Sequence, residues 1–323
     1  MRVAVDTTPL AQTRAGTARY LASLLERLER EVEIRRLAFR PAHPPALGDV
    51  LWYPALLTRA ARGCDVLHCP TFRAPLHRAR VPTVVTVHDL AVLRYPEVFP
   101  RWSRTYGRFA VPRAVRAAAR VIAVSEFTKR EVIELLGVPE ERIRVVPNAV
   151  ADVFGPEGDA ADGDYVLAVG TLEPRKNLVR VAEAARRAQV ELRVAGERGW
   201  GGVDVADGVR WLGFVPDDEL AGLYRGAQCV LYTSLYEGFG IPVLEALACG
   251  APVVTSVGTA MEEVADGAAV LVDPRDAEAI AAGISEAIRR RGELGRRGLE
   301  RARAYSWDAA AEATAAVYRE VAA

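Results

Sequence analysis

Two glutamates flank a glycine-rich loop in the second half of the 323-residue chain. Glu237 precedes Gly238 and Gly240, and Glu245 follows Glu237 by eight positions. Pro242 predicts that a helix begins here, because the first turn of a helix tolerates a residue without an N–H. A glycine-flanked loop that leads into a helix presents free backbone N–H groups and the positive end of the helix dipole. This arrangement favours a diphosphate or another anion.

The two carboxylates restrict the anion that this site could bind. They would repel it unless they faced hydroxyl groups at its ends. A nucleoside diphosphate sugar has that layout, with sugar hydroxyls at one end, ribose hydroxyls at the other, and charge between them. The alternative is an amphipathic helix on which Glu245 is merely solvated, and the spacing alone does not decide between the two.

Arg175 and Lys176 are the cations best suited to such an anion. They lie in segment 170–177, between an expected strand at 165–169 and an expected helix. Two positive charges there stabilise a diphosphate most at the leaving group, where negative charge grows during transfer. Only Lys129 and Lys176 are lysines among the 42 basic residues, so Lys176 is an unusual choice for this chain.

The segment from Glu237 to Glu245 resembles the E-x7-E motif of retaining glycosyltransferases with the GT-B fold, in the large GT4 group. Segments 173–177, 195–200 and 211–216 match the second domain of that group in order. The resemblance covers nearly the whole chain and is most specific from residue 170 to 274. It implies transfer of a sugar from a nucleotide donor with its anomeric configuration kept, through an oxocarbenium-like transition state.

The resemblance also assigns roles to individual residues. Lys176 aligns with the phosphate-binding lysine, while Glu237 would hold donor-sugar hydroxyls and Glu245 the ribose. His88 would contact the reacting sugar from the other domain, and His88, Glu237, Lys176 and Arg175 form the expected catalytic set. The expected donor-binding residues are Gly16, Gly170, Thr171, Gly196, Phe214, Val215, Ser234, Gly238, Phe239, Gly240 and Glu245. Packing of Phe214 in the core is the competing explanation for that residue.

One position departs from the family pattern. Many members have arginine after the strand glycine, where this chain has Thr171. Arg175 is the candidate substitute. The departure also supports an alternative, a non-catalytic GT-B subunit or scaffold, and a second alternative is a GT-B enzyme of the nucleotide-sugar epimerase type.

The first half of the chain offers fewer candidates. A short strand at 2–5 and a helix at 17–30 flank Gly16, which is a candidate for close approach to phosphate or sugar unless it serves only loop flexibility. His88 follows the β-branched strand 82–87, at the carboxyl end, where open α/β sheets bind ligands. His68 shares an edge position and is the weaker candidate. A lone histidine is more often structural than functional.

The strand–helix alternation predicts an α/β protein with the GT-B architecture, in which two doubly wound Rossmann-like domains enclose a cleft. The N-terminal, acceptor-side domain is expected at 1–155 and the donor-side domain at 163–305. Residues 152–164 have the composition of a linker. A C-terminal helix at 306–323 is expected to pack back on the first domain.

Segment 94–120 is basic and aromatic, with seven arginines and one acid. Such a mixture suits an anionic membrane surface or a phosphate-bearing acceptor. The alternative, which we favour, is a solvated helix pair with its aromatic side chains packed inward.

Composition excludes several other classes of protein. The formal net charge is zero, so nothing global indicates a partner such as nucleic acid. The four cysteines show no paired or metal-ligand spacing, which predicts reduced thiols in a cytoplasmic protein. Location at the inner face of the membrane is the option that segment 94–120 adds. No signal peptide or membrane-spanning run is expected.

No DxD-type pair is found at a strand end, so we predict no metal and no cofactor, with the nucleotide sugar as substrate. The sequence does not identify the sugar, base or acceptor. Segments 173–177 and 196–200 are similar to those of members that build bacterial surface polysaccharides or glycolipids, often from GDP-mannose.

Overall fold

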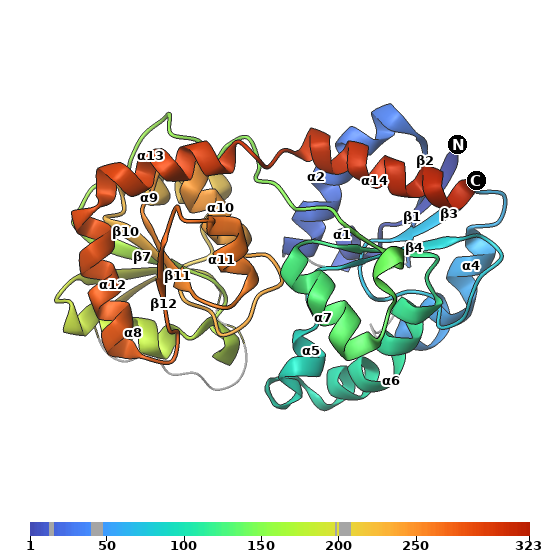
Figure 1. Ribbon diagram of the computed structural model, residues 1–323, viewed down its shortest axis with the longest axis horizontal. Coiled ribbons are helices and arrows are strands. Elements are labelled where there is room, and N and C mark those ends of the chain that lie inside the picture. The colour runs from blue at the N-terminus through green and yellow to red at the C-terminus, as the bar shows by residue number, and fades with distance from the viewer. Residues whose placement is uncertain (13–15, 40–47, 198, 200–207) are drawn as a thin grey trace. The chain divides into compact units, whose positions relative to one another are not determined.

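The computed structural model describes residues 1–12, 16–39, 48–197, 199 and 208–323. The chain forms two compact units (Figure 1). Unit 1 contains Met1–Asn148 and Ser306–Ala323, and unit 2 contains Ala149–Tyr305. Each unit has one six-stranded parallel sheet with helices around it, which confirms the predicted α/β class with two doubly wound sheets.

The sheet of unit 1 has the strand order β2-β1-β3-β4-β5-β6. Its strands are β1 (Arg2–Asp6), β2 (Glu33–Leu37), β3 (Val66–Cys69), β4 (Thr83–Val87), β5 (Arg120–Ala123) and β6 (Ile143–Val145). The inner strands β3 and β4 are buried along their whole length, as expected when helices cover both faces of a parallel sheet.

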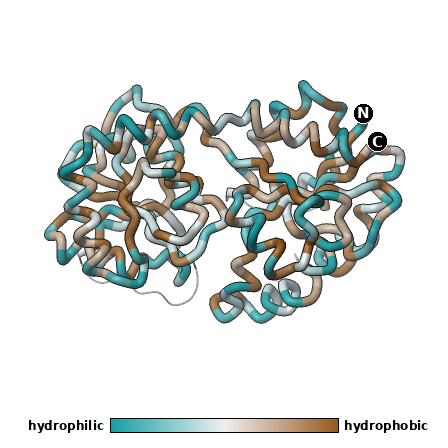
Figure 2. Tube along the Cα trace, viewed as in Figure 1, coloured by the Kyte–Doolittle hydropathy of each residue, from teal (hydrophilic) through white to brown (hydrophobic). Residues whose placement is uncertain are grey.

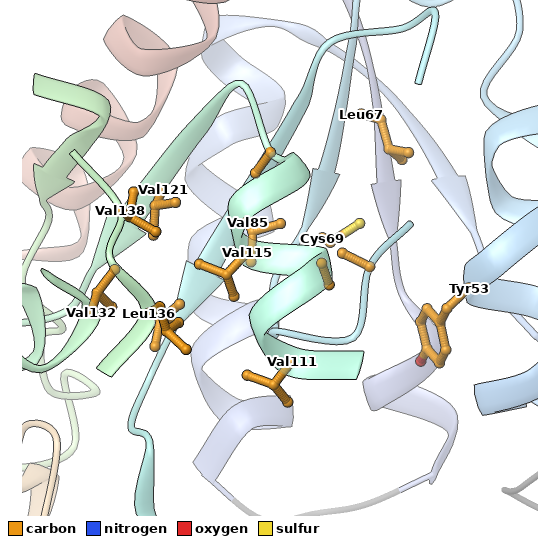
Figure 3. Packing of buried hydrophobic residues seen from close by; sticks show 14 of the residues in the cluster. Tyr53, Leu67, Cys69, Val85, Val111, Val115, Val121, Val132, Leu136 and Val138 are labelled. Carbon is orange, nitrogen blue, oxygen red and sulfur yellow. The ribbon is translucent and has the colours of Figure 1, made fainter. Parts of the chain in front are cut away.

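The helices of unit 1 divide between the two faces of its sheet. They are α1 (Thr8–Gln12), α2 (Gly16–Glu31), the π-helix η1 (Gly48–Leu56), α4 (Leu57–Ala60), α5 (Ala91–Arg94), η2 (Pro96–Val98), α6 (Arg101–Ala117), α7 (Glu126–Leu136), η3 (Glu140–Arg142) and α14 (Trp307–Ala322). Val115 of α6 and Leu136 of α7 pack with Val85 and Val121 of the strands on one face (Figure 3). Helices α2 and α14 pack on each other, and α14 also contacts β3 and β5.

Unit 2 repeats the plan, with the strand order β12-β11-β10-β7-β8-β9. Its strands are β7 (Tyr165–Val169), β8 (Glu191–Ala195), β9 (Val209–Gly213), β10 (Cys229–Tyr232), β11 (Val253–Ser256) and β12 (Val270–Val272). Its helices are η4 (Pro174–Lys176), α8 (Leu178–Arg187), α9 (Asp217–Gly226), α10 (Ile241–Ala248), α11 (Ala260–Ala265), α12 (Ala277–Arg289) and α13 (Arg291–Ala302). Helices α8 and α12 pack together on one face of this sheet. Figure 2 shows that hydrophilic and hydrophobic residues are interspersed along the helices of the chain.

The segment expected to be a linker is part of unit 2. The Ala161 N–H donates to the Gly222 carbonyl at 2.9 Å, and Arg225 Nε donates to the Asp159 carbonyl at 2.8 Å. The ring of Phe154 packs edge-on against Tyr224. Although its composition is rich in Asp, Gly and Ala, this segment is bound to the surface of unit 2, because its backbone carbonyls accept hydrogen bonds from α9.

Candidate active site in unit 2

The strongest candidate site lies where β7 and β10 end. The loop after β7 forms the turn η4, which carries Arg175 and Lys176, and the loop after β10 carries Glu237. The two loops are joined by their backbones, because the Leu235 N–H donates to the Arg175 carbonyl at 2.9 Å. Neighbouring parallel strands thus bring together residues that are far apart in the sequence, at the edge of the sheet where α/β proteins bind ligands.

Glu237 is the centre of this group. Lys176 Nζ lies 2.7 Å from Glu237 Oε1, and Arg175 Nη1 lies 2.7 Å from Glu237 Oε2. Arg175 Nη2 also donates to Glu173 Oε1 at 2.7 Å. We call Glu173, Arg175, Lys176 and Glu237 the charged cluster. It holds two cations and two carboxylates, all largely buried.

Burial and ion pairing act in opposite directions on the charged cluster. Burial alone would raise the pKa of Glu237, but Arg175 and Lys176 lower it to about 2. Burial would likewise lower the pKa of Lys176, yet the Glu237 carboxylate raises it above its ordinary value. Both groups are therefore charged at neutral pH.

Tyr232 contacts Lys176 directly, and Asn177 anchors the end of the turn that carries both cations to the segments after β10 and β12. Lys176 Nζ donates to the Tyr232 hydroxyl at 2.6 Å and lies 4.9 Å from the centre of its ring. Asn177 Nδ2 donates to the carbonyls of Thr233 and Pro274 at 3.0 and 2.6 Å. Asn177 has a left-handed φ of 60°, a conformation that asparagine tolerates better than most residues.

Glycine is required where the β7 and β8 loops meet. A Cβ on Gly196 would lie 2.1 Å from the Gly170 carbonyl oxygen, a distance that no side chain can accommodate. The Gly170 N–H in turn donates to the Ala195 carbonyl at 2.9 Å. Gly170 and Gly196 therefore allow the two strand-end loops to approach each other closely, next to the Lys176 side chain.

Glu245 is buried on α10, not solvated. Only 2% of its surface is exposed, and its Oε2 accepts a hydrogen bond of 2.9 Å from the Tyr224 hydroxyl. The alternative of a solvated amphipathic helix is therefore wrong. Helix α10 begins after Gly240, which has a left-handed φ of 98°, and Pro242 lies in its first turn as the sequence predicted.

Three other predicted donor-binding side chains have different surroundings. Phe239 is buried with its ring edge-on against Tyr305 at 5.7 Å, so only its backbone remains for a ligand. The Ser234 hydroxyl is buried and has no hydrogen-bond partner among the described residues. Phe214 is 64% exposed, which excludes core packing as the reason for this aromatic residue; Val215, next to it, is half-buried.

Thr171 does not reach the charged cluster through any described contact. Its Cγ2 packs so closely on Gly199 that a Cβ there would lie 2.5 Å away. Arg175 is the second cation at Glu237, as Lys176 is the first. The rest of the 195–200 motif, Arg198 and Trp200, lies outside the described residues.

His88 follows β4 in unit 1 and is held in one orientation. Its Nε2 donates to the Pro70 carbonyl at 2.9 Å, and the Tyr20 ring lies edge-on at 4.6 Å. Burial lowers the pKa of His88, so the imidazole is neutral at pH 7. With Nε2 donating, Nδ1 carries the lone pair, and no described residue donates to it.

His68 and Gly16 differ from what the sequence suggested. His68 lies inside β3 and is fully buried between two hydroxyl groups, so it is not at the sheet edge. Gly16 is the first residue of α2, and a Cβ there would meet no atom within 4 Å. Nothing in the described part of unit 1 requires glycine at this position.

Comparison with known proteins agrees with these features. A family model described as "Glycosyl transferases group 1" matches residues 153–305, and one described as "Glycosyltransferase Family 4" matches residues 12–153. O-antigen chain mannosyltransferase B of Escherichia coli is 33% identical over 284 residues, which cover 79% of this chain and 74% of that relative. The chain belongs to the group 1, or family 4, glycosyltransferases.

Other relatives and structures extend the comparison of this glycosyltransferase. The O-antigen chain mannosyltransferase RfbU of Salmonella typhimurium is 29% identical, with 71% of this chain and 68% of the relative covered. Sucrose-phosphate synthase from Thermosynechococcus elongatus matches with a TM-score of 0.78 at 21% identity, over 99% of this chain and 98% of that one. Anabaena Alr3699/HepE in complex with UDP and glucose matches with a TM-score of 0.76 at 20% identity, over 99% and 100%. These structures support the GT-B fold.

The sequence of this glycosyltransferase did not reveal all of its polar cluster residues. Tyr232 and Tyr224 lie on a strand and a helix as ordinary aromatic residues, and only their contacts with Lys176 and Glu245 distinguish them. Asp6 was also missed. It is fully buried at the end of β1, where burial raises its pKa to about 6, and its Oδ2 has no hydrogen-bond partner among the described residues.

Two further searches covered the described residues of this glycosyltransferase. They contain no group of three or more His, Cys, Asp and Glu side chains that could hold a metal ion. In the same residues, no helix has both the length and the apolar character needed to cross a membrane. The four cysteines are free and buried.

Proposed function

We propose that this glycosyltransferase moves a hexosyl group, mannosyl in the first instance, from a nucleoside diphosphate sugar to an acceptor hydroxyl with retention of configuration. The observation that carries the proposal is the charged cluster: two buried cations at the strand ends, beside the glycine loop that opens α10. Cations and free helix N–H groups together suit a diphosphate.

In this scheme Lys176 and Arg175 bind the diphosphate and stabilise the charge that grows on it as the sugar leaves. Both cations are paired with Glu237 in the structure. Diphosphate binding therefore competes with these ion pairs and frees Glu237 oxygens for the hydroxyls of the donor sugar. Glu245, already a hydrogen-bond acceptor, would take the ribose hydroxyls.

His88 would act as a neutral acceptor. Because its Nε2 donates to the Pro70 carbonyl, its Nδ1 is left to accept a hydrogen bond from a sugar hydroxyl. A lowered pKa keeps this lone pair available at neutral pH, whereas an imidazolium would repel the developing positive charge of an oxocarbenium ion.

The choice of donor rests on relatives and is the finer part of the proposal. The relatives from Escherichia coli and Salmonella typhimurium are named as O-antigen chain mannosyltransferases, which favours GDP-mannose as donor and surface polysaccharide or glycolipid as product. The Anabaena protein in complex with UDP and glucose supports nucleotide binding by this fold.

The resemblance of segment 237–245 to the motif of retaining enzymes supports the proposal of retention, and the proposed reaction needs no covalent nucleophile. The acceptor hydroxyl would attack from the face that the nucleotide leaves, and an oxygen of the leaving phosphate would take its proton. We also propose that no metal or other cofactor takes part. Transfer should then be unchanged in excess EDTA, and loss of activity that Mg²⁺ restores would contradict this.

A thermal-shift panel with GDP, UDP, ADP and dTDP tests the donor site. A nucleotide at a hundred times its dissociation constant should stabilise the protein by about 2.7 kcal/mol, enough for a shift of several degrees. Lys176→Ala should lose the shift, whereas Lys129→Ala, the change of the other lysine, should keep it. No shift with any nucleotide would contradict the proposal.

A product assay separates transfer from the epimerase-type alternative. Transfer requires an acceptor and releases the nucleoside diphosphate, whereas an epimerase would convert the donor without one. Acceptor-independent conversion of GDP-mannose would therefore overturn the assignment. Turnover that needs a partner chain would support the scaffold alternative for this member of the family.

We further propose that α6 contacts an anionic membrane surface. Trp102 and Phe109 are 48% and 54% exposed, so these two aromatic side chains are not packed inward as the alternative required. Arg101 and Arg104 make no ion pair with any described residue, and α6 contains no acid. At the two ends of segment 94–120 the arginines are paired: Arg94 with Glu131, and Arg120 with Glu320.

Co-sedimentation with vesicles tests this contact. Binding to phosphatidylglycerol vesicles but not phosphatidylcholine vesicles is expected, and it should weaken as salt increases. The double variant Trp102→Ala, Phe109→Ala should bind less. Phe127→Ala, which changes a residue on α7, serves as the aromatic control, and equal binding by all variants would contradict the proposal.

A further inference from the structure

A chain of buried hydrogen bonds connects the last helix of unit 1 with the surroundings of His88. The Tyr318 hydroxyl of α14 lies 2.7 Å from His68 Nδ1, and His68 Nε2 lies 2.9 Å from Thr86 Oγ1. Thr86 Oγ1 in turn lies 3.4 Å from the Tyr20 hydroxyl. We call Tyr318, His68, Thr86 and Tyr20 the neutral chain. All four side chains are almost completely buried.

The neutral chain contains no ionised group at neutral pH. Burial and the neighbouring His88 lower the pKa of His68 to about 3, burial raises the pKa of Tyr20 to about 12, and burial also raises the pKa of Tyr318 well above its ordinary value. A neutral imidazole has one donor and one acceptor nitrogen, so a hydroxyl on each side satisfies both. His68 thus fixes the spacing between α14 and β4 without a buried charge.

His88 is held from two sides by residues tied to this chain. Its Nε2 partner is the carbonyl of Pro70, two residues after His68. Its ring partner is Tyr20, whose hydroxyl is the other end of the neutral chain. Thr86 lies two residues before His88 on β4. A displacement of His68 would therefore reach His88 through the loop after β3, through Tyr20, and along β4.

We propose that Tyr318 is a positioning residue for His88, acting through His68, Thr86 and Tyr20. The inference rests on the proposed function, because it assumes that His88 contacts the donor sugar. It assigns α14 a task beyond covering the sheet: the helix sets the orientation of the imidazole whose Nδ1 accepts the sugar hydroxyl.

Packing alone would already hold α14. Apolar residues of the helix, among them Ala311, Ala315 and Val317, are buried on unit 1. Hydrogen bonds inside a protein largely replace hydrogen bonds to water, so their main contribution here is direction and distance. A fully satisfied buried network permits one arrangement of its members, which an apolar contact would not.

Tyr318→Phe is the decisive variant, because it removes one oxygen and keeps the ring. Thr314→Val is the matched control: Thr314 is one turn earlier on α14, fully buried, and its hydroxyl donates only to the Ala310 carbonyl of the same helix at 2.7 Å. Both variants lose a buried hydroxyl from α14, but only Tyr318→Phe breaks the neutral chain.

Two measurements are made on each variant. The first is steady-state transfer, for which Tyr318→Phe should lower kcat on the order of tenfold with the KM for the donor and the nucleotide thermal shift unchanged. The second is the imidazole spectrum of protein labelled with 15N-histidine, which is readable because the chain has four histidines. The His88 signals should move in Tyr318→Phe and stay in place in Thr314→Val.

The inference is overturned if Tyr318→Phe leaves the His88 signals and kcat unchanged. If Tyr318→Phe does not fold, Thr86→Val breaks the same chain from the strand side, and Thr86→Ser, which keeps the hydroxyl, should restore both readouts. Failure of the proposed function is separate: His88→Ala with full activity would remove His88 from the mechanism, whereas the movement of the His88 signals would still report the coupling.

Discussion

The charged cluster of unit 2 and the neutral chain of unit 1 stabilise buried polar groups in opposite ways. Glu237 stays ionised because Arg175 and Lys176 face it, and the cluster carries no net charge. The neutral chain avoids charge altogether, since His68 is uncharged between two hydroxyls. The comparison teaches that the ion pairs of the charged cluster can be rearranged by an added anion, whereas the hydrogen bonds of the neutral chain fix only the distances between its members.

Of the changes that test this comparison, removal of Lys176 should have the largest effect on transfer activity. Lys176→Ala deletes a charge that acts where negative charge develops, so transfer should fall by roughly 10²–10³-fold in kcat/KM. Steady-state assays with the donor identified by the thermal-shift panel measure this. The control Lys129→Ala removes a lysine paired with Glu140 on the surface of unit 1 and should keep its activity. An equal loss of kcat/KM in both variants would show that the charged cluster has no special role in transfer.

Asp6 should show the cost of burying a carboxylate without a cation. Its pKa is raised to about 6, so the folded state binds its proton more tightly than the unfolded chain does. The resulting stability is present below about pH 4 and is lost as the pH rises through 6. Asp6→Asn should therefore raise the free energy of unfolding at pH 7 by up to about 3 kcal/mol.

Urea denaturation of Asp6→Asn and of the parent at pH 3.5 and pH 7 measures the difference. The gain should vanish at the lower pH. Asp65→Asn is the control on the same unit, because Asp65 accepts a hydrogen bond from the Arg2 N–H in an exposed setting and should give no such gain at pH 7. A gain of equal size at both pH values would contradict the electrostatic explanation.

Glu237→Gln should act in opposite directions on binding and on transfer. Without the carboxylate, Lys176 and Arg175 lose their ion-pair partner and become available to a diphosphate. The free nucleoside diphosphate should therefore bind more tightly, by about tenfold if one ion pair worth about 1.4 kcal/mol is released. Transfer should fall, because donor-sugar hydroxyls lose their acceptor. Calorimetric titration measures the predicted gain in nucleotide affinity, and the transfer assay measures the predicted loss of activity.

The control for this change is Glu183→Gln, which removes the ion pair with Arg187 on the outer face of α8. Neither nucleotide affinity nor transfer should change in it. Weaker nucleotide binding by Glu237→Gln would show that the carboxylate positions the cations more than it competes for them.

Thr171→Arg should have the smallest effect. If Arg175 already supplies the second cation, a further arginine adds little, and nucleotide affinity should stay within about twofold, in the range of a neutral substitution. Calorimetric titration checks this. A large gain in affinity would show that Arg175, held by Glu173 and Glu237, does not replace the residue that other members have at this position.

The sequence predicted more of the candidate site residues in unit 2 than in unit 1, and the reasons are physical. The candidate donor-site residues of unit 2 lie near glycines, prolines and strand ends, which have local sequence signatures, so Lys176, Glu237 and Glu245 could be proposed from the sequence pattern. The buried partners Tyr232 and Tyr224 have no such signature, because their roles arise only when β10 and α9 pack beside other elements.

In unit 1 the same limit is more severe. His88 could be predicted from its place after a buried strand, but His68 occupies a similar sequence context and lies inside the sheet. What separates them is the Tyr318 hydroxyl, 250 positions away in sequence. The π-helix η1 was missed for a similar reason, since Tyr53 packs into the core of unit 1 from a segment without helical periodicity (Figure 3).

Unit 1 is built from two stretches of chain, with all of unit 2 between them. A ribosome therefore completes unit 2 before it synthesises α14. Until then, the surfaces of α2, β3 and β5 that α14 covers remain open, and His68 has no partner for its Nδ1. The N-terminal half therefore cannot complete its packing until the last helix has been synthesised.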